Sequence, residues 1–194
     1  MMDGKGILRF ILILPSVSEK GQFRLRDLPG SGGRVDILCR SLAACFDWGP
    51  ATWPKSMLEL VAVIANKVTL RVQDPGKLLP RGEAQWAETI RRVLNDSSTD
   101  FATGQKAALP ELMAELHQGH VWVLEKTGKP FGEIKTMNPD GENTFIVGDH
   151  RGFDSQTQLT LDDHSIYRIS IGKRSYLSSH CIAAIISKFE RMVV

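Results

Sequence analysis

The hydrophobic residues of this chain fall either into short continuous runs or into stretches where they recur every three or four positions. Continuous runs are typical of buried strands, and recurring positions are typical of amphipathic helices. The pattern predicts six strands, at residues 7–14, 58–64, 67–72, 121–124, 145–147 and 166–171. It predicts four helices, at residues 34–46, 83–94, 111–118 and 178–192. Because strands alternate with helices, we expect an α/β fold with a mostly parallel sheet flanked by helices.

Glycine, proline and polar residues mark the connections between these elements. Asn66 and Lys67 predict a tight hairpin between the second and third strands. Residues 74–82 are rich in proline and glycine and residues 96–106 are polar, so both segments are predicted to be loops. A turn is predicted at residues 126–129, directly after a short strand.

The composition adds the expected setting to this fold prediction. At 194 residues the chain is long enough for a real core, and we expect one domain over residues 1–194. The net charge of +2 neither requires nor excludes a nucleic-acid partner. Three cysteines, an odd number without metal-site spacing, favour reduced thiols and a cytoplasmic location. The apolar run at residues 7–15 is too short to span a bilayer, so no membrane association is expected.

Two of the later strands lead directly into loops that contain glycine. Gly148 and Gly152 follow the strand at residues 145–147, and Gly172 follows the strand at residues 166–171. Parallel sheets bind ligands at the carboxyl ends of their strands and against helix N-termini, and the second loop opens the last helix. Glycine also lets the backbone approach a ligand closely. If the protein is an enzyme, its chemistry is therefore predicted at these two loops.

Charged residues in the two loops suggest what they could do. Asp149 stands beside His150 and Arg151, where its carboxylate could accept a proton or orient a nucleophile. The alternative is that Asp149 only forms an Asx turn. Lys173 and Arg174 in the second loop suit an anionic partner.

An earlier glycine-rich loop, at residues 30–33, precedes the first predicted helix. Its backbone N–H groups could face a phosphate, or its glycines could form only a flexible turn, and both remain open. No Gly-Lys-Ser/Thr follows, so the loop is not a P-loop. Arg34 and Arg40 lie on similar faces of the helix, where they could bind phosphates or form a solvated surface.

Two further residue sets suggest no separate chemistry. Cys181 lies one turn into the last helix, where packing against a ligand is favoured over nucleophilic attack. His117 and His120 are three residues apart, but Gly119 ends the helix between them. No metal site is therefore predicted.

Three separated motifs resemble one known family. They read L-P-G-S-G-G-R-V-D-I-L-C-R (28–40), F-I-V-G-D-H-R-G-F (145–153) and I-S-I-G-K-R-S-Y-L-S-S-H-C-I (169–182). The resemblance is to the TrmY family of SPOUT-class, knotted methyltransferases, which methylate N1 of pseudouridine at position 54 in the T-loop of archaeal tRNA. It extends over nearly the whole chain. The chain is also similar, more distantly, to the ribosomal pseudouridine methyltransferases related to Nep.

The resemblance implies a SPOUT α/β-knot fold whose C-terminal trefoil knot, about residues 120–194, binds S-adenosylmethionine. It further implies a homodimer through the knot and an RNA substrate, expected to be tRNA, with no role for DNA. Implied cofactor-binding residues are Leu124, Gly148, Gly152, Ile169, Ser170, Ile171, Gly172, Leu177 and Cys181. Implied substrate-binding residues are Asp36, Arg40, Arg151, Lys173 and Arg174, and implied catalytic residues are Asp149 and Arg34.

Two other functions remain open at this point. One is a knotted module that binds RNA without catalysis, and the other is a methyltransferase that acts on a protein or a small molecule. A binding module would show RNA affinity that falls with salt but no methyl transfer. A small-molecule enzyme would not respond to RNA.

Overall fold

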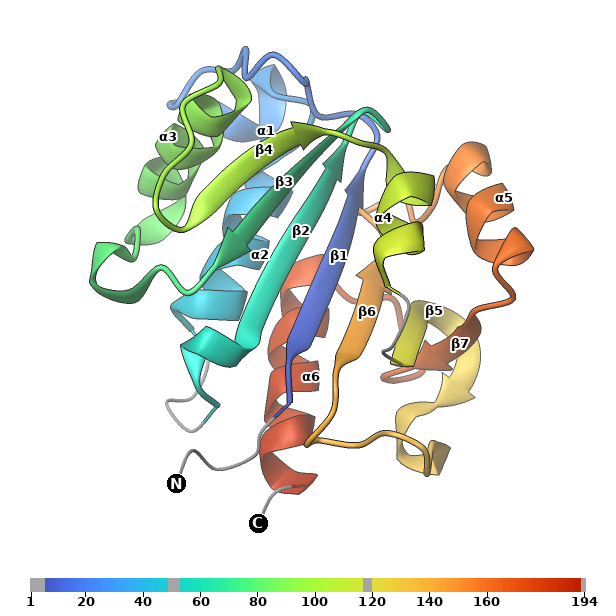
Figure 1. Ribbon diagram of the computed structural model, residues 1–194. Helices are drawn as coiled ribbons and strands as arrows, with labels where there is room; N and C mark the ends of the chain where they lie inside the picture. The colour runs from blue at the N-terminus through green and yellow to red at the C-terminus, as the bar shows by residue number, and fades with distance from the viewer. Residues whose placement is uncertain (1–5, 49–52, 117–119, 193–194) are drawn as a thin grey trace.

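The computed structural model describes residues 6–48, 53–116 and 120–192, which form a seven-stranded sheet with helices on both faces (Figure 1). The strands are β1 (Leu8–Leu14), β2 (Leu58–Ile64), β3 (Val68–Gln73), β4 (Ala102–Lys106), β5 (His120–Pro130), β6 (Asn143–Val147) and β7 (Tyr167–Ser170). The helices are α1 (Leu28–Ser31), α2 (Val35–Phe46), α3 (Gly82–Leu94), α4 (Leu109–Glu115), α5 (Ser155–Asp163) and α6 (Ser178–Met192). Short 3₁₀ turns are η1 (Lys55–Met57), η2 (Gly76–Leu78) and η3 (Phe131–Glu133).

The sheet has the strand order β4-β3-β2-β1-β6-β5-β7. Strand β1 pairs in parallel with β2 on one side and with β6 on the other, and β5 pairs in parallel with β6 and β7. The β2–β3 and β3–β4 pairs are antiparallel, and Ile64 lies opposite Val68 across the expected hairpin. The predicted α/β fold with a mostly parallel sheet is therefore confirmed.

Apolar side chains pack on both faces of the sheet. Helices α2, α3 and α6 cover one face, where the larger core includes Phe10 and Phe145 (Figure 1). Helices α4 and α5 cover part of the other face through Leu112 and Leu161, which share a smaller core with Ile11. Successive side chains of a strand point to opposite faces, so a central strand buried on both sides is apolar at every position. This requirement explains the unbroken hydrophobic runs of β1 and β2.

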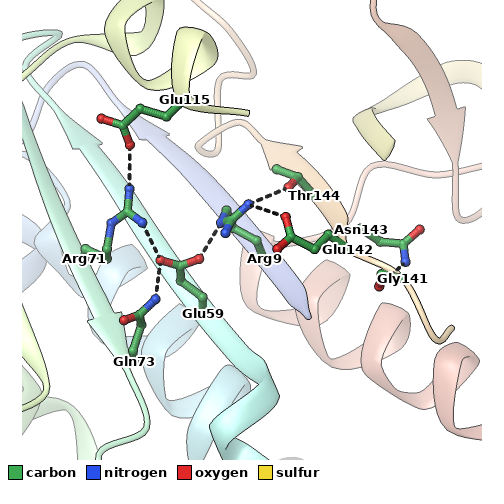
Figure 2. Close-up of polar contacts among 9 residues, drawn as sticks. All are labelled: Arg9, Glu59, Arg71, Gln73, Glu115, Gly141, Glu142, Asn143 and Thr144. Carbon is green, nitrogen blue, oxygen red and sulfur yellow. Dashed lines mark hydrogen bonds and ion pairs between the residues drawn. The ribbon is translucent and has the colours of Figure 1, made fainter. Parts of the chain in front are cut away.

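A cluster of ionic contacts lies on the α4 side of the sheet, near the amino ends of β1 and β2 (Figure 2). Glu59 is 1% exposed. One of its carboxylate oxygens bonds to Arg9, and the other accepts from Arg71 at 2.9 Å and from Gln73 at 2.8 Å. Arg71 also reaches Glu115 of α4 at 3.0 Å. The buried carboxylate is thus fully hydrogen-bonded, which is the condition under which a buried charge is tolerated.

Three elements were missed by the sequence prediction. The short helix α1 lies partly in the glycine-rich segment that was predicted to be a loop, and the N–H of Gly30 donates to the Asp27 carboxylate. Residues 96–106, predicted to be a loop, contain the edge strand β4, in which Ala102 is buried and the other four residues are exposed. Because four of its five residues are exposed, this strand has no alternation of apolar and polar residues to detect. Helix α5 buries only Thr157 and Leu161, so it also lacks a continuous apolar stripe. Its start is instead fixed by Asp154, whose carboxylate accepts the N–H of Thr157 at 2.8 Å.

Several boundaries also differ from the prediction, and β6 begins two residues before its predicted start. Strand β5 continues through the predicted turn at residues 126–129, but Leu124 and Lys129 both lie opposite Ile169. The four residues between them therefore bulge out of the pairing with β7. Helix α4 begins two residues before the predicted start and ends at Glu115, while the predicted end at residues 117–119 lies outside the described residues.

Candidate active site

The carboxyl ends of β5, β6 and β7 enclose a cavity of about 690 Å³. This volume lies within the usual range for small-molecule sites. Eight of the nine residues expected to bind a cofactor line it: Leu124, Gly148, Gly152, Ser170, Ile171, Gly172, Leu177 and Cys181. The ninth, Ile169, does not line this cavity, and its side chain is fully buried in the sheet.

The loop after β6 is a tight turn that depends on both of its glycines. The N–H of Gly152 donates to the carbonyl of Asp149 at 3.1 Å, and Gly152 has a φ of +86°. A Cβ at Gly148 would lie 2.7 Å from the carbonyl oxygen of Gly152, closer than Cβ atoms approach other atoms. The hydroxyl of Ser178 donates to the Gly148 carbonyl at 2.8 Å, which ties the turn to the start of α6.

The loop after β7 is shaped by Ser170. Its hydroxyl donates to the carbonyl of Gly172 at 2.6 Å and accepts the Gly172 N–H at 3.2 Å. A Cβ at Gly172 would lie 2.5 Å from the hydroxyl of Tyr176, so a glycine here lets that ring close over the loop. Apolar side chains and backbone polar atoms thus face the same cavity, a combination that suits a nucleoside with a charged tail.

Asp149 is held by its own turn. Its side chain is 4% exposed, and its Oδ1 accepts the N–H of Arg151 at 2.6 Å, which is the Asx turn left open by the sequence. Its Oδ2 lies 3.7 Å from Nδ1 of His150. The guanidinium of Arg151 donates to the hydroxyl of Ser16, just beyond β1, at 2.6 Å.

A second, smaller cavity of about 20 Å³ adjoins the first on the side of α2. It has about the room of one water molecule, so a larger group would lie across its mouth. Its lining is Arg34, Ile37, Arg40, His150, Leu177, Ser178 and Ser179. Its position brings the arginines expected to serve catalysis and RNA binding next to the predicted cofactor loops.

Asp36 holds the two arginines of this smaller cavity. Arg34 donates to both of its carboxylate oxygens, at 2.9 and 3.1 Å, and Arg40 bonds to the same group. Burial opposes ionisation of Asp36, but the hydrogen bond and charge of Arg34 outweigh it, so the pKa of Asp36 lies below its ordinary value. Both guanidiniums remain about one-third exposed, while Asp36 itself lines neither cavity.

The remaining predicted residues are divided between cavity and surface. Arg151 and Arg174 line the larger cavity, whereas Lys173 is exposed and lines neither cavity. Cys181 is 8% exposed, and burial raises the pKa of its thiol to about 11. The thiol is therefore neutral near pH 7, which supports a packing role over nucleophilic attack.

Sequence reasoning missed several residues that line the larger cavity. Gln158 lies on α5, which carried no detectable pattern, and Glu125 and Lys126 belong to the bulge of β5. Others stood inside recognised motifs but were not selected. The residues missed in this way are Val147, His150, Phe153, Ser175, Tyr176 and His180.

Metal and membrane features are absent from the part of the chain that the structure describes. Within residues 6–48, 53–116 and 120–192, no three His, Cys, Asp or Glu side chains gather as a metal site. His117 of the rejected histidine pair lies outside these residues. In the same ranges no helix is both long and apolar enough to cross a membrane.

Known proteins resemble the chain in sequence along most of its length. Residues 7–194 match the family described as "Putative SAM-dependent RNA methyltransferase". The tRNA (pseudouridine(54)-N(1))-methyltransferase of Pyrococcus abyssi is 26% identical, over 94% of this chain and 97% of the relative. The protein of the same name from Methanosarcina mazei is 29% identical, over 93% of this chain and 90% of the relative.

Solved structures resemble it in fold. Archaeoglobus fulgidus Nep1 bound to S-adenosylhomocysteine has a TM-score of 0.69 at 14% identity, over 97% of this chain and 99% of that one. A ribosomal RNA small subunit methyltransferase E from Neisseria gonorrhoeae, bound to S-adenosyl methionine, has a TM-score of 0.53 at 12% identity, over 96% of this chain and 66% of that one. These structures confirm the expected SPOUT α/β-knot fold class. Because the family match spans nearly the whole chain, the protein belongs to the family of SAM-dependent RNA methyltransferases.

Proposed function

We propose that this protein transfers the methyl group of S-adenosylmethionine to N1 of pseudouridine in RNA, with position 54 of tRNA as its target. The observation that carries the proposal is the match to relatives named for that reaction over at least 90% of both chains. The arrangement of the two cavities supports it, because a cofactor-sized cavity opens beside a pair of exposed guanidiniums.

The larger cavity is assigned to the cofactor. Leu124, Ile171 and Leu177 supply apolar surface for an adenine ring, and the loop backbones at Gly148 and Gly172 supply polar atoms without obstructing side chains. Bound there, S-adenosylmethionine supplies an activated methyl group on a sulfonium. The protein then has mainly to align acceptor, methyl carbon and sulfur.

The surface around the smaller cavity is assigned to RNA. Arg34 and Arg40 present planar donors that match phosphate or uracil carbonyl oxygens, and Asp36 fixes their orientation. Arg151, Arg174 and the exposed Lys173 extend this positive surface along the loops. A base must leave its stack to reach such a site, which favours a loop of RNA over a duplex.

Asp149 is assigned to the reaction centre, where it accepts the proton of N1 or orients the group that does. Arg34 stabilises negative charge that develops on the uracil carbonyl oxygens. The test is the turnover of the Asp149→Asn variant. If this variant methylates RNA at the wild-type rate and binds the cofactor with normal affinity, Asp149 has neither role.

A homodimer through the knotted C-terminal segment and a cytoplasmic location also belong to this proposal. Tyr176 and Leu177 are each about half exposed at the mouth of the cavity, where a second subunit could cover them. Light scattering at micromolar concentration should give twice the chain mass, and Tyr176→Asp should shift the mass toward that of one chain. A single-chain mass for the wild-type protein would refute the dimer.

The direct test uses two T-arm stem-loops that differ only at position 54, one with pseudouridine and one with uridine. Labelled methyl from S-adenosylmethionine should enter the pseudouridine stem-loop and appear as N1-methylpseudouridine after digestion. Label in other RNA alone would reject the target and keep the reaction class. RNA binding without any transfer would support the non-catalytic module, and transfer to a non-RNA acceptor would support the third function.

A further inference from the structure

Two residues, His150 and Leu177, line both cavities. If the larger cavity holds the methyl donor and the smaller one faces the RNA base, the methyl group crosses between them at these two residues. Leu177 offers only hydrocarbon there. The imidazole of His150 is the group at this boundary with a ring nitrogen that can accept a proton.

The surroundings of His150 favour one orientation of its ring. Its Nδ1 faces Oδ2 of Asp149 at 3.7 Å, and the Asp149 side chain is almost completely buried. The other oxygen of Asp149 is occupied by the N–H of Arg151. A carboxylate beside Nδ1 favours the proton on that nitrogen and leaves Nε2 as a free acceptor. The His150 side chain is 32% exposed, so part of the ring is open to a ligand.

Other groups at the smaller cavity are poor proton acceptors. Arg34 and Arg40 are permanent cations that only donate hydrogen bonds. The hydroxyl of Ser178 already donates to the Gly148 carbonyl. Asp149 lines the larger cavity but not the smaller one, and its two carboxylate oxygens already face the N–H of Arg151 and the ring of His150.

We propose that His150 is the catalytic proton acceptor of this methyl transfer and that Asp149 is its positioning residue, an inference that rests on the proposed function. In the step, N1 of pseudouridine gives its proton to Nε2 of His150 and forms a bond to the methyl carbon. The carbon–sulfur bond breaks, and its electron pair remains on sulfur, which becomes a neutral thioether. His150 then returns the proton to water. Arg34 and Arg40 line the smaller cavity with His150, and they stabilise the electron-rich base while the proton leaves. On the side of the larger cavity, the charged residues that share its lining with His150 are Glu125, Lys126, Asp149, Arg151 and Arg174.

The test is chemical rescue of variants that lack the imidazole. His150→Ala and His150→Gly should lower kcat on the pseudouridine stem-loop by about 10²- to 10³-fold. Binding of S-adenosylhomocysteine and of RNA, measured by calorimetry, should stay within about threefold of wild type. Added imidazole should restore turnover, and substituted imidazoles of higher pKa should restore more. The matched control is His164→Ala, since His164 lies at the exposed end of α5 and should neither slow the reaction nor respond to imidazole.

A second readout does not depend on turnover. Nitrogen-15 NMR of the His150 ring should show a protonated Nδ1 and a bare Nε2 at pH 8, and Asp149→Asn should mix the two tautomers. Turnover of His150→Ala within threefold of wild type would overturn the inference. The inference would also be overturned if added imidazole restored turnover in neither His150→Ala nor His150→Gly while both variants still bound S-adenosylhomocysteine and RNA. A wild-type protein that methylates no pseudouridine-containing RNA would refute the proposed function and this inference with it.

Discussion

Removal of the charge on Glu59 should lower the stability of the protein and leave its methyl-transfer activity unchanged. Glu59→Gln keeps the shape of the side chain but leaves Arg9, whose side chain is 13% exposed, without its closest anion (Figure 2). Breaking a fully buried ion pair typically costs 3–5 kcal/mol. Arg9 retains a weaker contact to Glu142 at 3.7 Å, and Arg71 retains Glu115 and is 29% exposed. We therefore expect a smaller loss, of about 2–3 kcal/mol.

Thermal unfolding followed by circular dichroism measures this loss. For a chain of this length, about 2–3 kcal/mol corresponds to a fall in Tm of about 4–12 °C. The matched control is Glu142→Gln, because Glu142 contacts the same arginine but is 47% exposed, and its loss should stay below about 0.5 kcal/mol. Turnover at 25 °C should be unchanged, since the cluster lies at the opposite ends of the strands from the cavity. A Tm for Glu59→Gln within 1 °C of wild type would refute the reasoning.

Three further predictions concern the site. Asp36→Asn should lower methyl transfer by about 10- to 100-fold at unchanged cofactor affinity, because two guanidiniums lose their shared anchor. Since the folded pKa of Asp36 is lowered, its stabilisation is present above about pH 4 and lost as the pH falls further, so urea melts of wild type and Asp36→Asn should converge in acid. Gly148→Ala should weaken binding of S-adenosylhomocysteine at least tenfold by calorimetry, because its Cβ collides with the Gly152 carbonyl; unchanged binding would show that the turn adapts. Cys181 should react with iodoacetamide at pH 7.5 about two orders of magnitude more slowly than an ordinary thiol, with a rate still rising above pH 9; a plateau near pH 8.5 would contradict its raised pKa.

Most of the strands and helices that were predicted correctly share a strong burial signal, although β7 buries only Ile169. Strands β1, β2 and β6 are buried at nearly every position, and α6 places Ile182, Ile185 and Phe189 on one inward face. Strand β4 and helix α5 bury too few residues to produce such a signal. An element could therefore be predicted from sequence where packing against the rest of the fold buries enough of its residues to leave an apolar pattern.

The loops of the site could be recognised from sequence, but their spatial relation could not. Gly148 and Gly172 marked the cofactor loops because tight turns restrict residue choice. Nothing local showed that Arg34 lies across from His150, since the two are distant in sequence and meet only through the packing of α2 beside α6. The pairing of Asp36 with Arg34 and Arg40 is local in sequence, but the burial of Asp36 depends on packing by distant residues.

The central position of β1 has a consequence for the synthesis of this protein. Leu8 is synthesised well before Asn143, one of its two strand partners. At typical translation rates the intervening residues take roughly 7–27 s to be made. During that time the edge of β1 that will later pair with β6 has no native partner. An apolar strand with an unpaired edge can pair with other chains and aggregate. The nascent chain should therefore depend on a holding chaperone until β6 emerges, and depletion of such factors should reduce its soluble yield.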